Sequence, residues 1–204
     1  MKLYFTPGTC SLAPHIAIRE LGLDVQLRRV RIGPEPVLVA DGSDFRRINP
    51  LGYVPVLELD DGSLLTEGVA MLQYLSDLAP EAGLAPPAGS RERTTLQQWL
   101  TFISSELHKS FSPWLFHPEY GEQAAQVARQ RIDSRFTHVE RHLQTHPYLL
   151  GETFSVADAY LFTVADWTRP LKMPLAAWPA LAAYLERVRG RDSVAQALRL
   201  EKAA

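Results

Sequence analysis

The sequence predicts a small α/β domain followed by a larger, all-helical one. The first eighty or so residues show the order β-α-β, an irregular link, and β-β-α. A stretch rich in proline, glycine and alanine, PEAGLAPPAGS, comes next, and nearly every segment beyond it has helical periodicity. We therefore expect an α/β domain at residues 1–80, a linker at 81–90 and a helical domain at 91–204.

The first domain begins with KLYFT, a short strand-like run, followed by a helix up to Leu21. Ser11 or Cys10 is expected to cap this helix, and Gly22 stands where a left-handed C-terminal cap belongs. VQLRRVRI alternates apolar and basic residues, as a half-exposed strand does. VPVLEL and SLL predict two more strands joined by a hairpin at the Asp60-Asp61-Gly62 turn, and Glu67 to Leu78 has helical spacing.

In the second domain, the apolar spacing predicts four long helical segments. They cover residues 91–116, 122–146, 156–169 and 178–200, the last with a break near Gly190. Ser155-Val156-Ala157-Asp158 is a capping box with aspartate in place of glutamate at its third helical position. We assign a structural role, rather than a ligand-binding one, to Ser155 and Asp158.

The composition is that of an ordinary globular protein of 204 residues, with 46% apolar and 22% charged residues. The net charge of −2 gives no electrostatic footprint for nucleic acid or an anionic membrane. The N-terminal apolar run is too short for a signal peptide, and no apolar stretch reaches the roughly 20 residues of a membrane helix. One cysteine excludes an internal disulfide and a four-cysteine zinc site. We expect a cytoplasmic protein without a metal site.

The single cysteine, Cys10, lies at a strand-to-helix corner. A thiol reacts as its thiolate, and the pKa of a thiol falls at a helix N-terminus. The alternative is that Cys10 is a small buried hydrophobe. The motif C-S-L-A resembles the C-x-x-C of thioredoxin-like oxidoreductases with Ala13 in place of the second cysteine, which excludes dithiol cycling. One-thiol chemistry remains: a mixed disulfide, or stabilisation of another molecule's thiolate by Cys10, Ser11 and the helix terminus. His15 is expected to be a packed or capping histidine.

Two further motifs predict a site for a short peptide. In a thioredoxin-like topology, Pro55 is expected to be cis and to leave the backbone of Val54 able to pair with an extended peptide; an ordinary trans proline at a strand start is the alternative. Gly68 opens a helix whose N–H groups suit a carboxylate, and Glu67 either binds a ligand ammonium or favours the helix dipole. Glutathione, a zwitterionic peptide with a thiol, fits both.

The chain resembles the cytosolic glutathione transferases, in particular the bacterial beta class. The similarity spans the whole length in KLYFTPGTCSLAPHI, INPLGYVPVLELDDG, LLTEGVAMLQYL, ELHKSFSPW and FSVADAYLFTV, in the expected order. The resemblance implies a thioredoxin-like first domain, an all-α second domain and a homodimer that binds glutathione between the domains. Glutathione is then a co-substrate, and no other cofactor is implied.

Residue by residue, the resemblance gives Cys10, with Ser11 beside it, the contact or bond to the glutathione sulfur. It makes Val54 and Pro55, with Tyr53 next to them, the clamp on the cysteinyl part. Glu67 and Gly68 become the γ-glutamyl site.

From the helical domain, the resemblance gives His108 and Lys109 the role of closing over the thiol. For Lys109, the alternative is an i,i+3 pair with Glu106. Thr101 stands where an asparagine of the neighbouring subunit is expected to reach the ligand. RIGPEPVLVADGSD lacks the lysine that related enzymes offer to the glycine carboxylate and carries Glu35; the basic residues nearby are Arg31, Arg46 and Arg47.

Three functions agree with these residues. The leading one is a transferase that joins the glutathione thiolate to small hydrophobic electrophiles; the others are a thiol-disulfide oxidoreductase working through a Cys10 mixed disulfide and a non-catalytic glutathione-binding or ligand-carrying dimer. An electrophile pocket or an ordinary core is expected around Phe111, Trp114, Phe116 and Trp167. Trp and Phe residues on the first helices after the linker, together with residues 67–77, are candidates for the dimer interface.

Overall fold

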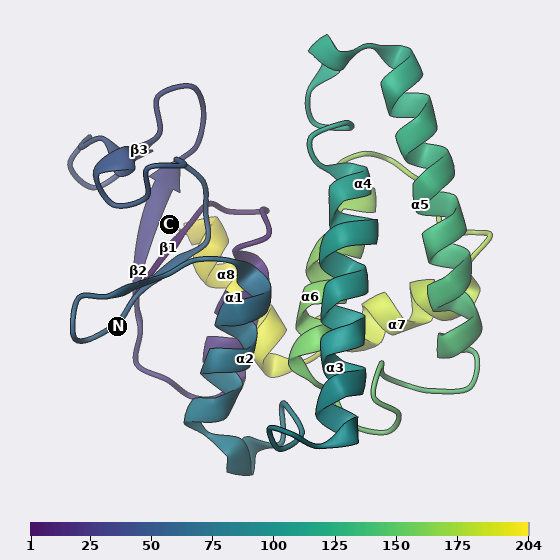
Figure 1. The fold of residues 1–204 in the computed structure, drawn as a ribbon. Coiled ribbons are helices and arrows are strands. Elements are labelled where there is room, and N and C mark those ends of the chain that lie inside the picture. The colour runs from purple at the N-terminus through teal and green to yellow at the C-terminus, as the bar shows by residue number, and fades with distance from the viewer. Residues whose placement is uncertain (204) are drawn as a thin grey trace. The chain divides into compact units, whose positions relative to one another are not determined.

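The structure, a computed structural model, describes residues 1–203. The chain forms two compact units: unit 1 contains Met1–Gly83 and the segment that begins at Arg191, and unit 2 contains Leu84–Gly190 (Figure 1). Within the described residues, no helix combines the length and the hydropathy that a membrane crossing requires.

Unit 1 is built on a five-stranded mixed sheet with the strand order β3-β2-β1-β4-β5. Its strands are β1 (Lys2–Phe5), β2 (Gln26–Arg31), β3 (Val37–Leu38), β4 (Val56–Glu58) and β5 (Leu64–Leu65). β1 pairs with β2 in parallel, and the other neighbours are antiparallel. The helices are α1 (Leu12–Glu20), α2 (Gly68–Leu78) and α8 (Asp192–Ala203), with short 3-10 turns η1 (Phe45–Arg47) and η2 (Pro80–Ala82). The predicted thioredoxin-like order, β-α-β and then β-β-α, is confirmed.

Three local signals in unit 1 produce the expected geometry. Gly22 has φ +63°, and its N–H and that of Leu23 bond the carbonyls of Arg19 and Ile18, which is the Schellman arrangement at a helix end. The Asp60-Asp61-Gly62 turn joins β4 to β5, with Leu59 N–H donating to the Ser63 carbonyl at 2.9 Å. The Val54–Pro55 peptide bond is cis, as predicted.

Unit 1 also departs from the sequence prediction. The segment expected to be an irregular link contains β3 and η1, in which Phe45 is fully buried against Tyr4 and Val30. The expected helical domain reaches residue 204, whereas α8 packs on α1 in unit 1. Arg191 and Ser193 at the start of α8 both donate to the Glu20 carboxylate of α1, at 2.7 and 2.5 Å. Amphipathic spacing predicted the helix but not its packing partner.

Unit 2 is helical. It contains α3 (Arg91–Phe102), a π-helical segment η3 (Ile103–His108), α4 (Lys109–Phe111), η4 (Pro118–Tyr120), α5 (Glu122–Leu143), α6 (Val156–Ala165), η5 (Asp166–Thr168) and α7 (Pro179–Arg189). All ten residues of α6 are buried, so this helix forms the centre of the unit. The first helical segment ends at Phe111 rather than at residue 116, because Ser112 takes an extended conformation before Pro113.

The capping box at the start of α6 is present. The Asp158 carboxylate accepts hydrogen bonds from the Ser155 N–H and hydroxyl, both at 2.8 Å. It also accepts from the Leu149 N–H at 2.9 Å and the Tyr184 hydroxyl at 3.1 Å. Burial raises the pKa of Asp158 to about 6, although these donors favour the carboxylate. Four donors from three segments therefore meet at one buried side chain, which agrees with a structural role.

Candidate functional site

Cys10 lies in the turn between β1 and α1 and is half-buried. Its Sγ donates to the Val54 carbonyl oxygen over 3.5 Å. Val54 belongs to the cis Val54–Pro55 bond just before β4, so the turn and this bond meet at one corner of unit 1. The cysteine motif and the proline motif therefore face one another in unit 1.

Ser11 stands at the N-cap of α1, one of the two positions expected, but its side chain makes no capping hydrogen bond. Its backbone is already helical, and its fully buried hydroxyl points back into the turn. The Ser11 Oγ accepts from the Thr6 N–H at 3.1 Å and lies 2.9 Å from the Thr9 hydroxyl. Ser11 therefore holds together the turn that carries Cys10.

A buried pair outside the sequence prediction also holds this turn. Glu201 of α8 accepts the Gly8 N–H at 3.1 Å with one carboxylate oxygen, and its other oxygen lies 3.2 Å from Nδ1 of His15. His15 is fully buried, as expected for a packed histidine. Glu201 stands 186 positions from His15, so no local pattern could have indicated the contact.

Tyr53 and Glu67 flank the start of α2. The Tyr53 hydroxyl donates to the Glu67 carboxylate at 3.0 Å. Partial burial and the neighbouring Glu67 charge raise the pKa of Tyr53. Glu67 precedes Gly68 at the N-cap and has φ +63° and ψ +107°, a conformation that L-residues rarely adopt. The Glu67 side chain makes no capping hydrogen bond to α2. Glu67 is therefore an N-cap residue with a left-handed backbone and not an ordinary first-turn glutamate. The sequence pattern did not indicate this conformation.

His108 ends the π-helical segment η3 in unit 2. Its Nδ1 lies 2.7 Å from the Tyr160 hydroxyl, and its ring packs edge-on against Trp167 at 4.9 Å between centroids. Burial, with a smaller effect from the Lys109 charge, lowers the pKa of His108 to about 4. The imidazole is therefore neutral near pH 7, able to exchange hydrogen bonds but not to supply a positive charge. π-Helical segments occur frequently at functional sites.

Lys109, the next residue, is exposed. Glu106, its alternative partner, instead accepts from Arg135, at 2.6 Å from Nη2. Thr101 is also exposed, and its carbonyl accepts the hydroxyls of Ser104 and Ser105. The structure therefore gives Glu106 a partner on α5 rather than in its own helix.

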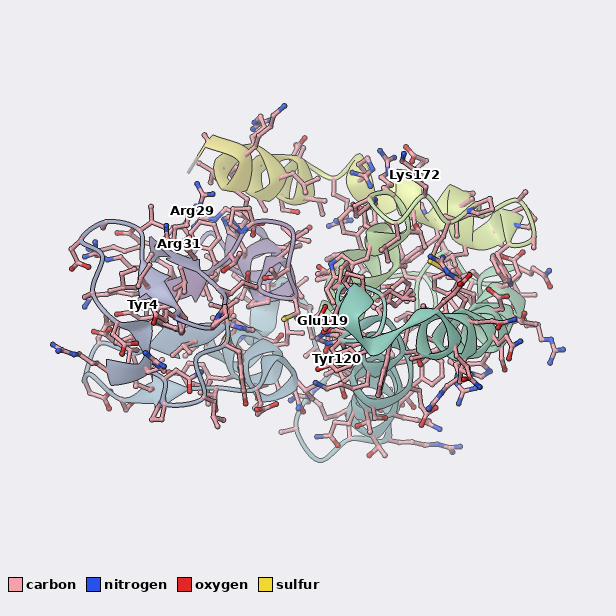
Figure 2. All side chains as sticks on the ribbon, turned by 90° about the horizontal axis from the view of Figure 1, so that it is seen from above. Tyr4, Arg29, Arg31, Glu119, Tyr120 and Lys172 are labelled. Atoms are coloured by element: carbon pink, nitrogen blue, oxygen red, sulfur yellow. The ribbon has the colours of Figure 1, made fainter. Side chains whose placement is uncertain are left out.

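Three arginines are candidates to replace the lysine that related enzymes offer to the glycine carboxylate, and their surroundings differ. Arg46 forms a side-on pair with Asp44, with Nε and Nη2 bonded to the two carboxylate oxygens. Arg47 and Glu35 are exposed. Arg31 is exposed on β2, where Figure 2 shows it beside Arg29. These environments do not select one cation for the glycine carboxylate.

The four aromatic residues expected to line a pocket or to form core separate into two groups in unit 2. Phe111 and Phe116 pack on Trp167, at 5.8 and 5.4 Å between ring centroids. Phe111 and Trp167 are buried, whereas Phe116 is 42% exposed. Trp114 packs instead on Tyr120, at 5.7 Å.

A thioredoxin-like sheet with one cysteine before its first helix and a cis proline opposite defines a thiol-handling protein with a helical second unit. The chain belongs to the glutathione S-transferase family. Residues 8–78 match the family model described as the glutathione S-transferase N-terminal domain, and residues 122–187 match the C-terminal domain.

Relatives cover both units. Glutathione S-transferase GstA of Escherichia coli O157:H7 is 41% identical over 98% of each chain. The structure of a ternary complex of BphK, a bacterial transferase, has 50% identity and a TM-score of 0.95 over 99% of this chain and 100% of that one. A beta-class enzyme of Sphingomonas chungbukensis has 40% identity and a TM-score of 0.94 over 100% of both chains. The protein is a glutathione transferase of the bacterial beta-class type and uses glutathione as its co-substrate.

Proposed function

We propose that Cys10 contacts the glutathione sulfur while this sulfur is transferred to a small hydrophobic electrophile. The contact between Cys10 and the Val54 carbonyl carries the proposal. A cysteinyl residue that pairs with the Val54 backbone brings its own sulfur next to Cys10. A solved relative, the sphingomonad enzyme complexed with glutathione, supports the choice of peptide.

The other residues of unit 1 then receive the ends of the peptide. Glu67 takes the γ-glutamyl ammonium, and the N–H groups at Gly68 take its carboxylate. Tyr53 holds the Glu67 carboxylate in place through its hydroxyl. At Cys10, the S–H donor and the N-terminus of α1 stabilise a thiolate, which lowers the barrier to attack on an electrophile. Ser11 contributes by positioning the turn.

Unit 2 contributes His108 and Lys109 in this proposal, and Thr101 reaches the ligand from the neighbouring subunit. His108 is neutral at working pH and acts through hydrogen bonds. Lys109 supplies an exposed ammonium that favours an anionic sulfur. The apolar rings of Phe116 and Trp167 favour a hydrophobic electrophile.

A second candidate function is thiol-disulfide exchange. The disulfide-bond oxidoreductase YfcG of Escherichia coli K12 is 30% identical over 97% of this chain. In this reaction the Cys10 thiolate attacks the glutathionyl sulfur of a mixed disulfide and releases the other thiolate. Glutathione thiolate then attacks the Cys10 adduct, which gives oxidised glutathione and regenerates the Cys10 thiolate.

The test compares wild type with Cys10→Ala and Cys10→Ser. Conjugation of glutathione to 1-chloro-2,4-dinitrobenzene, reduction of 2-hydroxyethyl disulfide and intact mass after exposure to oxidised glutathione are measured together. We expect conjugation by Cys10→Ala to fall at least about tenfold, with an unchanged urea midpoint, because a thiolate contact is lost.

Two other outcomes decide between the candidates. If wild type gains one glutathionyl group and only disulfide reduction collapses in Cys10→Ala, Cys10 is a redox nucleophile and conjugation rests on other thiolate donors. If no adduct forms and neither rate depends on Cys10, both assignments are wrong.

The proposal includes a homodimer that works in a reducing cytoplasm. Large apolar side chains on unit 1, Leu51 at 70% and Leu78 at 44% exposure, favour a covered surface. Chemistry at a reduced Cys10 favours a reducing compartment. Gel filtration at micromolar concentration should give twice the mass of one chain, and a monomer would contradict the dimer.

A further inference from the structure

The strand β2 of unit 1 has one open side. On its inner side, Gln26–Arg29 pair with β1. On its outer side, β3 pairs only with the last two residues of the strand, Val30 and Arg31. The chain then leaves β3, and the Val39 N–H adds a single bond to the Arg29 carbonyl at 3.0 Å. Within residues 1–203, the first half of β2 therefore has no neighbouring strand on its outer side.

Two hydrogen bonds show which backbone groups point to the open side. The Gln26 N–H donates to the Met1 carbonyl at 3.1 Å, toward β1, whereas the Arg29 carbonyl accepts from Val39, away from β1. Successive residues of a strand direct their N–H and C=O groups to opposite sides. Leu27 therefore directs both its N–H and its C=O to the open side, as Arg29 directs its N–H. An added strand could pair with these three groups.

A hollow of about 410 Å³ lies along this side of β2. Its walls include Leu27, Arg28 and Arg29 on the strand and the segment 39–41 that follows β3. The Val39 side chain in this segment is 49% exposed and offers an apolar contact. At about 3.3 Å per residue, the open part of β2 leaves room for roughly three residues of extended chain. None of these residues belongs to the glutathione site proposed above.

The hollow carries positive charge. Arg28 and Arg29 are exposed, and as neighbours on a strand they project to opposite faces of the sheet. No carboxylate of residues 1–203 forms an ion pair with either of them. The nearby carboxylates have other donors: Asp41 accepts from a backbone N–H two positions ahead at 2.9 Å, and Glu58 accepts from Lys2 at 2.6 Å. Two guanidinium groups therefore border the open side without an acidic partner.

This charge selects what can pair with the strand. A second copy of the chain would place its own arginines against Arg29 and Arg31, which Figure 2 shows side by side. Like charges opposite one another destabilise a sheet, and cations on an edge strand oppose pairing with an identical edge. Two successive acidic residues in an extended segment instead place one carboxylate on each face of the sheet, where Arg28 and Arg29 are.

We propose that the open side of β2 binds an extended acidic segment of another protein by strand addition. The segment runs antiparallel to β2, because it continues the position of β3, and its backbone pairs with Leu27 and with the N–H of Arg29. Its carboxylates pair with Arg28 and Arg29, and an apolar neighbour contacts Val39. The surface thus recognises an acidic strand, separately from glutathione chemistry.

The test uses the fluorescein-labelled peptide Thr-Val-Glu-Glu-Val-Thr and its basic counterpart Thr-Val-Lys-Lys-Val-Thr, titrated by fluorescence anisotropy. Saturating S-hexylglutathione is present, so that the glutathione site is filled. Two further peptides carry an N-methyl group on the first or on the second glutamate. They have the same charge, and they differ only in which edge of the peptide backbone is blocked.

The protein variants are Arg28→Gln, Arg29→Gln and, as a matched control, Arg199→Gln, an exposed arginine of α8 in the same unit that does not line the hollow. We expect Arg28→Gln and Arg29→Gln each to weaken the acidic peptide at least about fivefold, because a carboxylate loses its partner. Arg199→Gln should stay within about twofold of wild type. All three variants should keep the conjugation rate of wild type, which shows that they are folded.

The N-methyl peptides test backbone pairing. One isomer should bind at least about tenfold more weakly than the parent and the other within about twofold, because only one of the two N–H groups faces β2. The basic peptide should not bind.

Four results would overturn the proposal. The first is absence of binding of the acidic peptide, or equal binding by wild type and both β2 variants. The second is an equal loss in Arg199→Gln, which would indicate a general charge effect. The third is equal binding of both N-methyl isomers and the parent, which would exclude strand addition. The fourth is binding that S-hexylglutathione abolishes, which would place the peptide in the glutathione site.

Discussion

The N-termini of α6 and α2 meet the same physical requirement in opposite ways. Every helix begins with N–H groups that have no partner inside the helix. At α6, the buried Asp158 carboxylate takes four donors, including the Ser155 N–H. At α2, Glu67 has a left-handed backbone, its carboxylate accepts from the Tyr53 hydroxyl, and its side chain makes no capping hydrogen bond to the helix. A helix start whose polar groups are hydrogen-bonded within the protein stabilises the fold. A helix start without a side-chain cap keeps its N–H groups available to a ligand.

The largest effect on stability is expected at the start of α6, where Asp158 accepts four hydrogen bonds. Asp158→Asn keeps the shape but turns an NH₂ group toward donors and removes a charged acceptor, so the free energy of unfolding should fall by about 3 kcal/mol. Urea denaturation measures this, and glutathione affinity by calorimetry should stay within about twofold. Asp133→Asn, exposed on α5, is the control. If the Asp158→Asn variant is as stable as wild type, the structural role assigned to Asp158 is wrong.

The same carboxylate predicts a pH dependence. Its folded pKa is about 6, above the reference 3.8, so its contribution is complete below pH 4 and is lost as the pH rises through 6. The stability gap between wild type and Asp158→Asn should therefore widen by about 2 kcal/mol from pH 6 to pH 4. Urea midpoints at intermediate pH values trace this change. A gap that narrows on acidification would show that the four donors outweigh burial.

At the uncapped end, stability and binding should separate. Glu67→Gly removes the strain of a left-handed residue and should raise the free energy of unfolding by about 1 kcal/mol. It should also weaken glutathione about tenfold, because the ammonium loses its partner. Lys172→Gly is a matched control: its φ is +52°, Figure 2 shows it in the loop before α7, and its variant should gain stability without losing affinity. Unchanged binding in Glu67→Gly would refute the γ-glutamyl assignment.

The smallest effect is expected at Ser155. Ser155→Ala removes one hydroxyl donor to Asp158 and should cost about 1 kcal/mol, with little change in glutathione affinity. Ser134→Ala on the exposed face of α5 serves as the control for loss of a hydroxyl. A tenfold loss of glutathione binding at unchanged stability would show that Ser155 belongs to the glutathione site instead.

Features encoded within a few residues were predictable. Gly22, the Asp60-Asp61-Gly62 turn and the Ser155-Asp158 box each depend on neighbours in sequence, and each forms as expected. The cis bond before Pro55 followed from the topology.

Features that depend on distant partners were not predictable. The Glu201 contacts join α8 to the Cys10 turn across most of the chain, and periodicity carries no information on such pairing. The left-handed backbone of Glu67 overrides its ordinary first-turn preference. The hydroxyl of Ser11 bonds within the turn, to Thr6 and Thr9, rather than to the helix that follows.

The packing of α8 in unit 1 has a consequence for biosynthesis. A ribosome completes β1 to α2 first and then makes all of unit 2, so the nascent chain carries the Cys10 turn for more than a hundred residues before Glu201 exists to bond Gly8. Unit 1 therefore cannot finish folding as an independent N-terminal piece during synthesis. The bond that holds the Cys10 turn to α8 can form only after Glu201 has left the exit tunnel.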